Sequence, residues 1–403
     1  MPIQAQTAVA GPTGSTLTHL ECSITGVRRD ADALATIDPE SGRALVARYD
    51  LEKAAASLSL DALRGRVQSL WRYREVLPIR DGAFVVSLGE GWTPLLAAPR
   101  LGKRLGLTGL MVKDEGRNPT GSFKARGLSA SVSRALELGA RAVAVPTAGN
   151  AGAALSAYAA RAGVPAHVAM PMDAPETIQA EVRAYGARLE LIDGLIHDAG
   201  HWIAEGCREH GWFNMATTKE PYRLEGKKTM GYELWEQLGG ELPDLVLYPT
   251  GGGTGLIGMW KAWDELEAMG KIDDRRPRLV AVQSTGCAPV VEAFERGADR
   301  VGPWPDAATL APGIRVPKPF ADDLILRAIR DTGGTAVSVE DEAILDAMVR
   351  LGADEGLDAC PEGAATLAGL LALQAKGDVD ADERIVLFNC GSGLKHPDLK
   401  PQG

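Results

Sequence analysis

A lysine at the end of a turn-rich stretch has the position that an amine nucleophile would need. Lys124 ends the run Asn-Pro-Thr-Gly-Ser-Phe-Lys at residues 118–124, whose breakers predict that a helix begins near Ser122. The positive end of a helix dipole and an apolar neighbour such as Phe123 both favour the neutral amine, which can form a Schiff base with a carbonyl group. A lone lysine at such a place is more often a solvated surface residue, so this interpretation depends on its companions.

A second turn, residues 146–152, reads Pro-Thr-Ala-Gly-Asn-Ala-Gly and joins a predicted strand to a predicted helix. It offers backbone N–H donors together with the Thr147 hydroxyl and the Asn150 amide, a set that suits an anion. Taken alone, Asn150 is explained more simply as the N-cap of the following helix.

A third turn contains Gly251, Gly252, Gly253, Thr254 and Gly255. Four glycines among five residues let the chain wrap closely around a tetrahedral phosphate with amide N–H groups pointing inward. A flexible turn is the alternative. The loop is not a Walker loop, because no Gly-Lys-Ser/Thr follows, and it is not a first-strand dinucleotide fingerprint.

Near the carboxyl end, a predicted strand runs into Cys390 and the sequence Cys-Gly-Ser-Gly-Leu-Lys. The Cys390 thiol would project into the crevice that the three turns share, although a cysteine at the end of a buried strand is often only a small core residue.

The elements that must position these turns alternate as β-branched runs and amphipathic segments, which is typical of βαβ units and a mostly parallel sheet. In open α/β sheets the loops at the carboxyl ends of the strands meet, so the turns should lie together. The predicted strands are residues 110–113, 142–146, 166–170, 188–192, 245–248, 279–283, 335–339 and 384–389, and the predicted helices are residues 153–161, 175–185, 222–238, 256–267, 341–356 and 363–374.

Composition excludes several classes of protein. The chain has 403 residues, 45% of them hydrophobic, which is enough for two buried cores. No apolar stretch is long enough to span a membrane and no secretory signal is visible, so we expect a cytoplasmic protein. Five scattered cysteines suit reduced thiols, and a net charge of -10 argues against a nucleic-acid partner.

Together these segments resemble the fold-type-II pyridoxal-5'-phosphate (PLP) enzymes and, within them, the threonine synthase family. The resemblance covers roughly residues 88–395. It rests on the three turns, on Trp-Thr-Pro-Leu at residues 92–95, on Tyr-Arg-Leu-Glu-Gly-Lys-Lys-Thr at residues 222–229, and on Gly-Ser-Gly-Leu-Lys at residues 391–395. It implies two open, mostly parallel twisted sheets with helices on both faces, and an N-terminal extension.

The resemblance implies a role for each matching residue. Lys124 matches the Schiff-base lysine, which also moves protons at the substrate carbons, and Asn150 matches the asparagine that binds the cofactor's phenolic oxygen. Gly251, Gly252, Gly253, Thr254 and Gly255 match the cup for the cofactor phosphate, and Phe123 belongs to the same cofactor site. Cys390 stands where the family places a Thr, Ser or Cys beside the pyridine nitrogen, and a neutral thiol there makes the ring a moderate electron sink.

The resemblance also implies which residues bind the substrate. Thr147, Gly149 and Ala151 match the loop that grips the substrate carboxylate. Arg223 matches an arginine that binds the phosphate of O-phosphohomoserine, with Thr217 and Thr218 nearby.

The resemblance also predicts the domain organisation. Residues 91–130 and 215–403 should form a large PLP-binding domain, residues 131–214 a small domain, and residues 1–90 an extension. The segment around Cys22 looks like the remnant of a four-cysteine zinc ribbon in which one cysteine survives, so no metal is expected. Related proteins are usually homodimers.

Departures from the family pattern leave the substrate open. Ala125 follows the lysine, as in many threonine and serine dehydratases, and Ala151 stands where a hydroxyl residue could reach a substrate phosphate. The leading hypothesis is a carbon–oxygen lyase of the threonine synthase type, which converts O-phospho-L-homoserine and water to L-threonine and phosphate. The alternatives are a threonine or serine ammonia-lyase, a β-replacing amino-acid synthase, and a catalytically silent PLP-fold protein.

Overall fold

The computed structural model describes residues 12–194 and 196–400. The chain divides into two compact units, which are described separately below. The first unit comprises the chain up to Trp92, Lys124–Thr229 and Asp264–Lys271, and the second comprises Thr93–Phe123, Met230–Trp263 and the chain from Ile272 onward.

The second unit is built on a six-stranded sheet in the order β12-β11-β10-β13-β5-β4. All neighbouring strands are parallel except the edge pair β4 and β5, which is antiparallel. Interior strands such as β10 are buried along their whole length, as expected for a parallel sheet covered on both faces. The strands are β4 (Leu95–Ala97), β5 (Gly109–Asp114), β10 (Leu245–Pro249), β11 (Arg278–Ser284), β12 (Thr335–Val339) and β13 (Arg384–Asn389).

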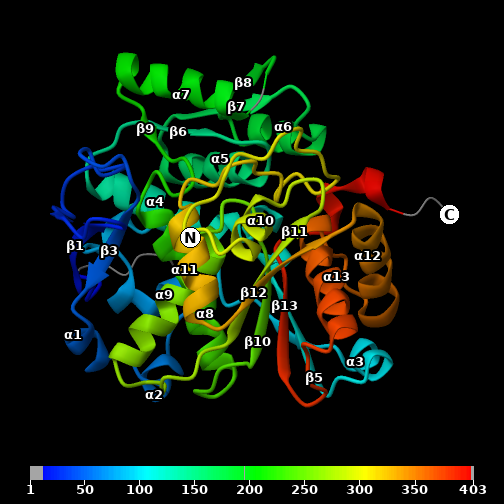
Figure 1. Cartoon of the computed structure of the whole chain (residues 1–403). Helices are drawn as coiled ribbons and strands as arrows, with labels where there is room; N and C mark the ends of the chain where they lie inside the picture. Colours follow the sequence, from blue (N-terminus) through cyan, green and yellow to red (C-terminus); the bar gives the residue numbers. More distant parts are fainter. Residues whose placement is uncertain (1–11, 195, 401–403) are drawn as a thin grey trace, which may run out of the picture. The chain divides into compact units, whose positions relative to one another are not determined.

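Helices cover both faces of this sheet (Figure 1). α3 (Pro99–Leu105), α12 (Asp341–Glu355) and α13 (Pro361–Lys376) pack on one face, where their side chains form a continuous core with Leu245, Leu247, Val280 and Val282. α10 (Pro289–Glu295) and α11 (Asp322–Asp331) contact β11 and β12. α8 (Tyr222–Gln237) and α9 (Thr254–Ala268) are continuous helices that pass from one unit into the other.

The first unit contains a four-stranded parallel sheet in the order β8-β7-β6-β9. Its alternate residues point to opposite faces: Val143, Val145 and Val168 face the core that contains α4 and α5, whereas Ala144 and Ala169 face α7. Figure 1 shows α7 on one side of the sheet and α5 on the other. The elements are β6 (Val143–Pro146), β7 (Ala166–Pro171), β8 (Arg188–Ile192), β9 (Phe213–Asn214), α4 (Lys124–Glu137), α5 (Asn150–Ala162), α6 (Glu176–Ala184) and α7 (Ile196–His210).

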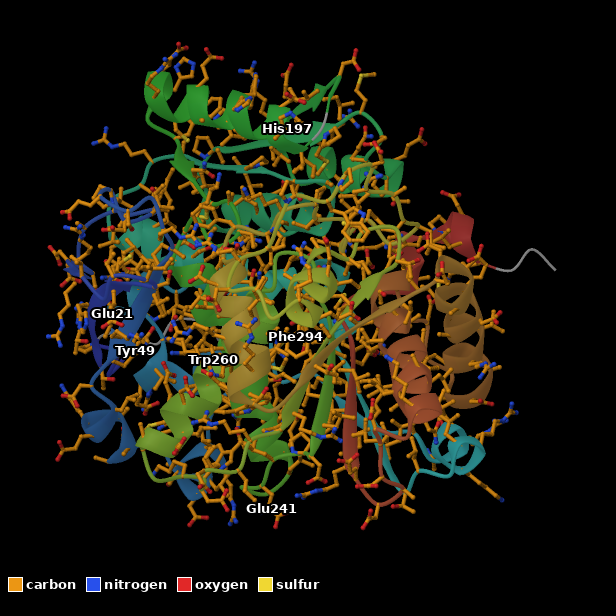
Figure 2. The ribbon with its side chains drawn as sticks, in the orientation of Figure 1. Glu21, Tyr49, His197, Glu241, Trp260 and Phe294 are labelled. Carbon is orange, nitrogen blue, oxygen red and sulfur yellow. The ribbon has the colours of Figure 1, made fainter. Side chains whose placement is uncertain are left out.

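The N-terminal segment forms a small antiparallel sheet of its own, in the order β2-β1-β3. Figure 2 labels Glu21 on β1 and Tyr49 at the end of β3. Short helices and turns follow, and the segment ends in the sequence Gly-Glu-Gly-Trp at residues 89–92. The elements are β1 (Leu17–Cys22), β2 (Arg28–Arg29), β3 (Leu45–Tyr49), α1 (Leu51–Ala55) and α2 (Leu60–Leu63).

Glu90 of that motif is buried and ties the segment to α4 and α5. Its carboxylate accepts hydrogen bonds from Trp71 Nε1 (2.9 Å), Ser129 Oγ (2.6 Å), Tyr158 OH (2.6 Å) and the Leu88 amide (2.9 Å). A buried carboxylate is tolerated only when it is satisfied in this way. The N-terminal segment is therefore fixed to the first unit by a polar network as well as by apolar packing.

The eight predicted strands and six predicted helices are all present. The helix expected near Ser122 begins at Lys124 instead, because Ser122 is extended and pairs with Gly391. No helix in the described part of the chain is both long enough and apolar enough to cross a bilayer.

Candidate active site

Lys124 is the first residue of α4, so its side chain stands at the positive end of the helix dipole, as predicted. The boundary between the two units falls at the peptide bond between Phe123 and Lys124. Phe123 is held in the second unit, where its amide donates to the Cys390 carbonyl (3.1 Å) and its ring meets Tyr248 edge-on. Phe123, the residue before the lysine, is therefore fixed to the end of the sheet in the second unit.

Within the first unit, α4 crosses α8 at a contact that only glycine permits. A Cβ on Gly226 would lie 2.0 Å from the Arg126 carbonyl oxygen, and one on Gly127 would lie 2.9 Å from the Arg223 carbonyl oxygen and 3.0 Å from Lys227 Cε. Gly127 is one turn beyond Lys124 and on the same helix face. The crossing thus places the side chain of Lys227 along the face of α4 that carries Lys124.

This crossing gathers positive charge away from water. Arg223 and Lys227 are almost completely buried, and Glu220 is the buried acid beside them. Desolvation lowers the pKa of Arg223 to about 10. Desolvation, together with the charges of Arg223 and Lys124, lowers the pKa of Lys227 well below its ordinary value. The crossing thus brings the basic groups of Lys124, Arg223 and Lys227 close to the buried carboxyl of Glu220.

Arg223 has unused hydrogen-bonding capacity. Its Nη1 donates to the Met215 carbonyl (2.7 Å), whereas Nε and Nη2 are buried without a hydrogen-bond partner in the described part of the chain. Buried guanidinium N–H groups are costly unless they are paired. Two parallel donors of this kind match two oxygens of a phosphate or carboxylate.

The buried carboxyl of Glu220 predicts a pH effect on stability. Burial raises its pKa from 4.5 to about 7, although it accepts the amides of Tyr222 and Arg223. The folded state therefore binds the proton more tightly, and between pH 4.5 and 7 this group makes the free energy of unfolding fall as pH rises. Chemical denaturation at pH 5 and pH 7 measures this effect. The free energy of unfolding of Glu220→Gln, taken relative to that of the unmodified protein, should be higher at pH 7 than at pH 5 by up to about 3 kcal/mol. An equal difference at both pH values would contradict this assignment.

In the turn after β6, Asn150 is not the N-cap of the following helix, so the simpler explanation of this residue is wrong. Gly149, not Asn150, is the N-cap of α5, and no side chain caps the helix. The Thr147 hydroxyl closes the turn by accepting the Gly149 amide (3.1 Å). Asn150 is the first residue of the helix, and its side-chain oxygen is buried without a partner in the described part of the chain. Ala151 follows on the same first turn, so this helix start presents amides and an unused side-chain amide, as a ligand site would.

Thr217 and Thr218 lie in the loop between β9 and α8, in the same unit as Arg223. Thr218 is nearly buried and has a left-handed backbone with φ of 57°, and its hydroxyl donates to the Thr217 carbonyl (2.7 Å). A threonine in this conformation is strained, and such strain is concentrated at functional sites. Their assignment to the substrate phosphate remains a prediction.

The glycine-rich turn lies in the second unit, between β10 and α9, and α9 begins at Thr254. Three of its glycines are fixed by close contacts: a Cβ on Gly251 would lie 2.8 Å from the Gly313 carbonyl oxygen, one on Gly253 would lie 2.2 Å from Ile325 Cγ1, and one on Gly255 would lie 2.0 Å from the Tyr248 hydroxyl. A merely flexible turn would not need such tight packing. The turn is a built cradle whose first amides point out of a helix N-terminus, where a phosphate binds favourably.

Gly253 allows a matched test of this cradle. Gly253 and Gly297 both have a left-handed backbone, with φ of 69° and 65°, but only Gly253 has a side chain within 4 Å of its missing Cβ. Gly297→Ala should cost about 1–2 kcal/mol in unfolding free energy from backbone strain alone. Gly253→Ala should add about 1–3 kcal/mol of overpacking and weaken PLP binding by about tenfold or more. Thermal unfolding and fluorescence titration with PLP measure the two effects, and equal PLP affinity in both variants would argue against a phosphate cradle.

Cys390 directly follows β13 in the second unit and is nearly buried. The loop after it pairs with the segment that leads to Lys124, because Ser392 donates its amide to the Gly121 carbonyl (2.9 Å) and Ser122 bridges Gly391. The Cys390 sulfur lies 3.6 Å from the sulfur of Cys360. Cys390 therefore lies at the carboxyl edge of the sheet, and its projection into a crevice shared with the three turns stays a prediction.

The sequence alone did not single out Lys227, Ser122 or Cys360, which the structure places next to predicted site residues. Lys227 looked like one of many helix charges until the glycine crossing placed it by α4. The hydroxyl of Ser122, two residues before the lysine, is buried without a partner in the described part of the chain. Cys360 is thirty residues from Cys390 and has no motif of its own. Of the three, only Ser122 had a signal in the sequence, because it is a polar residue inside the motif that ends at Lys124.

Comparisons with known proteins agree with this geometry. The family described as pyridoxal-phosphate dependent enzyme matches residues 86–391. The threonine synthase of Methanocaldococcus jannaschii is 39% identical over 360 residues, covering 89% of this chain and 88% of that protein. The threonine synthase of Methanosarcina acetivorans is 35% identical over 380 residues, covering 94% and 92%.

Solved structures confirm the fold that the sequence predicted. Maize serine racemase matches with a TM-score of 0.65 and 25% identity, over 75% of this chain and 88% of that chain. A threonine deaminase from T.th. matches with a TM-score of 0.64 and 27% identity, over 74% and 92%. The chain therefore belongs to the family of pyridoxal-phosphate-dependent enzymes of fold type II, and its relatives place it in the threonine synthase branch of that family.

Proposed function

We propose that this enzyme converts O-phospho-L-homoserine and water to L-threonine and phosphate. The observation that carries the proposal is Arg223, whose buried guanidinium has two N–H groups without a hydrogen-bond partner in the described part of the chain. A substrate with a phosphate at its far end would accept hydrogen bonds from both groups. Full-length similarity to threonine synthases supports the same conclusion.

The residues present suit PLP. The cradle of Gly251, Gly253 and Gly255 at the start of α9 fits a phosphate, and a Cβ at any of the three would clash with its surroundings. Asn150 has a buried oxygen without a partner in the described chain, so its amide is available to a ligand. Lys124 supplies the amine at a helix start. We assign Asn150 to the phenolic oxygen, the glycine cradle to the phosphate and Cys390 to the pyridine nitrogen.

Bound PLP supplies an electron sink that makes protons on the substrate carbons next to the amine acidic. The work of the chain is then to hold and move those protons. Lys124 would act as base and acid at the substrate α-carbon, because the helix dipole and the neighbouring basic groups favour its neutral amine. We assign to it the proton transfers at the α-, β- and γ-carbons.

The substrate is held at two ends. The amides of Gly149 and Ala151 and the hydroxyl of Thr147 bind the carboxylate, and Arg223, with Thr217 and Thr218, binds the phosphate. In the overall reaction the bond between the γ-carbon and the phosphate oxygen breaks, phosphate leaves with both electrons, and the water oxygen adds to the β-carbon. A cationic site at the leaving group stabilises the charge that develops there.

The alternative reaction is β-elimination from threonine or serine. Two positions favour it: Ala125 after the lysine, and Ala151, which has no hydroxyl for a phosphate. The structural likeness to a threonine deaminase adds to it. Arg223 weighs against it, because threonine and serine carry no second anion that could accept its two buried N–H groups.

One assay separates the two reactions. Purified enzyme is incubated with O-phosphohomoserine and, separately, with threonine, and phosphate, threonine and 2-oxobutanoate are measured. We expect phosphate and threonine to appear in equal amounts from the first substrate. Release of 2-oxobutanoate from threonine, with no phosphate from O-phosphohomoserine, would overturn the proposal in favour of the ammonia-lyase.

We also propose that the enzyme acts in the cytoplasm as a homodimer on a small-molecule substrate, with no nucleic-acid or membrane partner. The net charge of -10 supports the absence of a nucleic-acid partner. Light scattering during size-exclusion chromatography tests the oligomeric state, and a monomer mass across the micromolar range would contradict it.

A further inference from the structure

Two buried thiols face each other in the second unit. The sulfurs of Cys360 and Cys390 are 3.6 Å apart, and both residues are more than nine-tenths buried. Cys360 is the N-cap of α13, where its sulfur accepts the Gly363 amide (3.2 Å) and its thiol points toward Asn389 Oδ1 (3.7 Å). Neither cysteine is in a disulfide.

Glu362 and His396 extend this pair. One carboxylate oxygen of Glu362 and the two sulfurs all lie within 4.8 Å of one another. Glu362 Oε1 accepts the Gly313 amide (2.6 Å), but Oε2 is buried without a hydrogen-bond partner in the described chain. His396 Nε2 is also buried without one, 3.9 Å from that oxygen. Buried polar atoms left unsatisfied in this way require a ligand or an explanation.

We propose that Cys360, Cys390 and Glu362 form a binding site for a thiophilic divalent cation such as Zn²⁺, with water as the fourth ligand. Two thiolates and a carboxylate are ligand types that tetrahedral zinc binds, with Zn–S distances of about 2.3 Å. That bond length sets the two sulfurs of a tetrahedral site about 3.8 Å apart, close to the spacing here. All three residues belong to the second unit and are nearly buried.

The site has a consequence for the enzyme that rests on the proposed function. Cys390 is assigned to the cofactor's pyridine nitrogen, so zinc and the cofactor would make competing demands on one sulfur. A zinc-bound thiolate can no longer donate a hydrogen bond to that nitrogen. We therefore expect zinc to inhibit the enzyme reversibly.

The test compares Cys360→Ser with Cys287→Ser in the holoenzyme. Serine is a good N-cap, so the first variant keeps the helix start but loses a zinc ligand. Cys287 is a buried cysteine of the same unit that lies outside the cluster. The reduced proteins are kept under argon and titrated with ZnCl₂ against a chromophoric chelator, and then with CoCl₂ to look for the bands of tetrahedral thiolate-bound Co²⁺.

We expect one zinc per chain in the unmodified protein and in Cys287→Ser, and binding weaker by at least about tenfold in Cys360→Ser. Without metal, Cys360→Ser should keep its activity, and it should lose inhibition by zinc. Equal zinc affinity with and without Cys360, or no binding at all, would overturn the site. Zinc binding without inhibition would support the metal site and refute only its link to the cofactor. Zinc binding is measured without turnover, so its result does not depend on whether the proposed reaction is correct.

Discussion

Lys124→Ala should lower kcat by about 10⁴-fold or more and should abolish the yellow absorbance that appears when PLP is added. One residue supplies both the amine that holds the cofactor and the group that moves protons at the substrate carbons, so the substitution removes two contributions together. Lys124 is the first residue of α4 and its methylenes contribute little to the core, so the fold should survive. Visible absorbance, phosphate release and far-UV circular dichroism provide the measurements.

Two controls separate the role of Lys124 from a general loss of structure. Lys124→Arg keeps the positive charge at the helix start but cannot form the Schiff base, so it should be as inactive as the alanine variant. Lys219→Ala removes a lysine from the loop before α8 and should keep full colour and activity. A yellow Lys124→Ala protein would disprove the assignment.

The sequence predicted the second unit well because its strands are short β-branched runs bounded by glycine and proline. A parallel sheet buried on both faces requires such runs, and the pattern is therefore hard to mistake. β10 and β13 lie within one residue of their expected bounds. The glycine turn after β10 was recognised for the same reason, because local composition alone defines it.

The N-terminal part was harder to predict because its order comes from distant partners. β1 pairs with β3 across more than twenty residues, and Glu90 is satisfied by side chains from three separate segments. No local pattern announces either arrangement. The remnant zinc ribbon was expected from the resemblance, and in the structure Cys22 lies at the end of β1 with its sulfur 3.2 Å from Ser41 Oγ.

The residues of the candidate site divide in the same way, into those that local sequence identifies and those that distant contacts position. Lys124, Asn150 and the glycine turn stand in motifs and were found from sequence, whereas Lys227 and Cys360 owe their positions to a helix crossing and to a loop pairing. Asn150 illustrates how structure bears on a sequence interpretation: the sequence alone favoured an N-cap, the observed cap is Gly149, and binding of the cofactor by Asn150 stays a prediction. Positions of this second kind become visible only when the packing of distant segments is known.

Arg223→Ala should lower kcat/KM for O-phosphohomoserine by about 30- to 1000-fold, equivalent to about 2–4 kcal/mol for a charge-assisted pair with a phosphate. The loss should appear in both KM and kcat, because the guanidinium binds the phosphate and also stabilises the charge that develops on it as it leaves. Lys227→Met should produce a smaller loss in the same direction, since its charge lies one helix turn away. Inorganic phosphate, tested as a competitive inhibitor, should bind more weakly to both variants.

The control for Arg223 must account for its burial. The side chain also donates to the Met215 carbonyl, so alanine leaves a cavity and an unpaired acceptor, and part of any loss comes from the fold. Arg223→Lys keeps the charge and most of the volume but not the paired N–H groups, and it should recover part of the affinity. PLP absorbance should be intact in all three variants. If affinity for phosphate is unchanged in Arg223→Ala while stability falls, the buried guanidinium is structural and the phosphate of the substrate must be bound elsewhere.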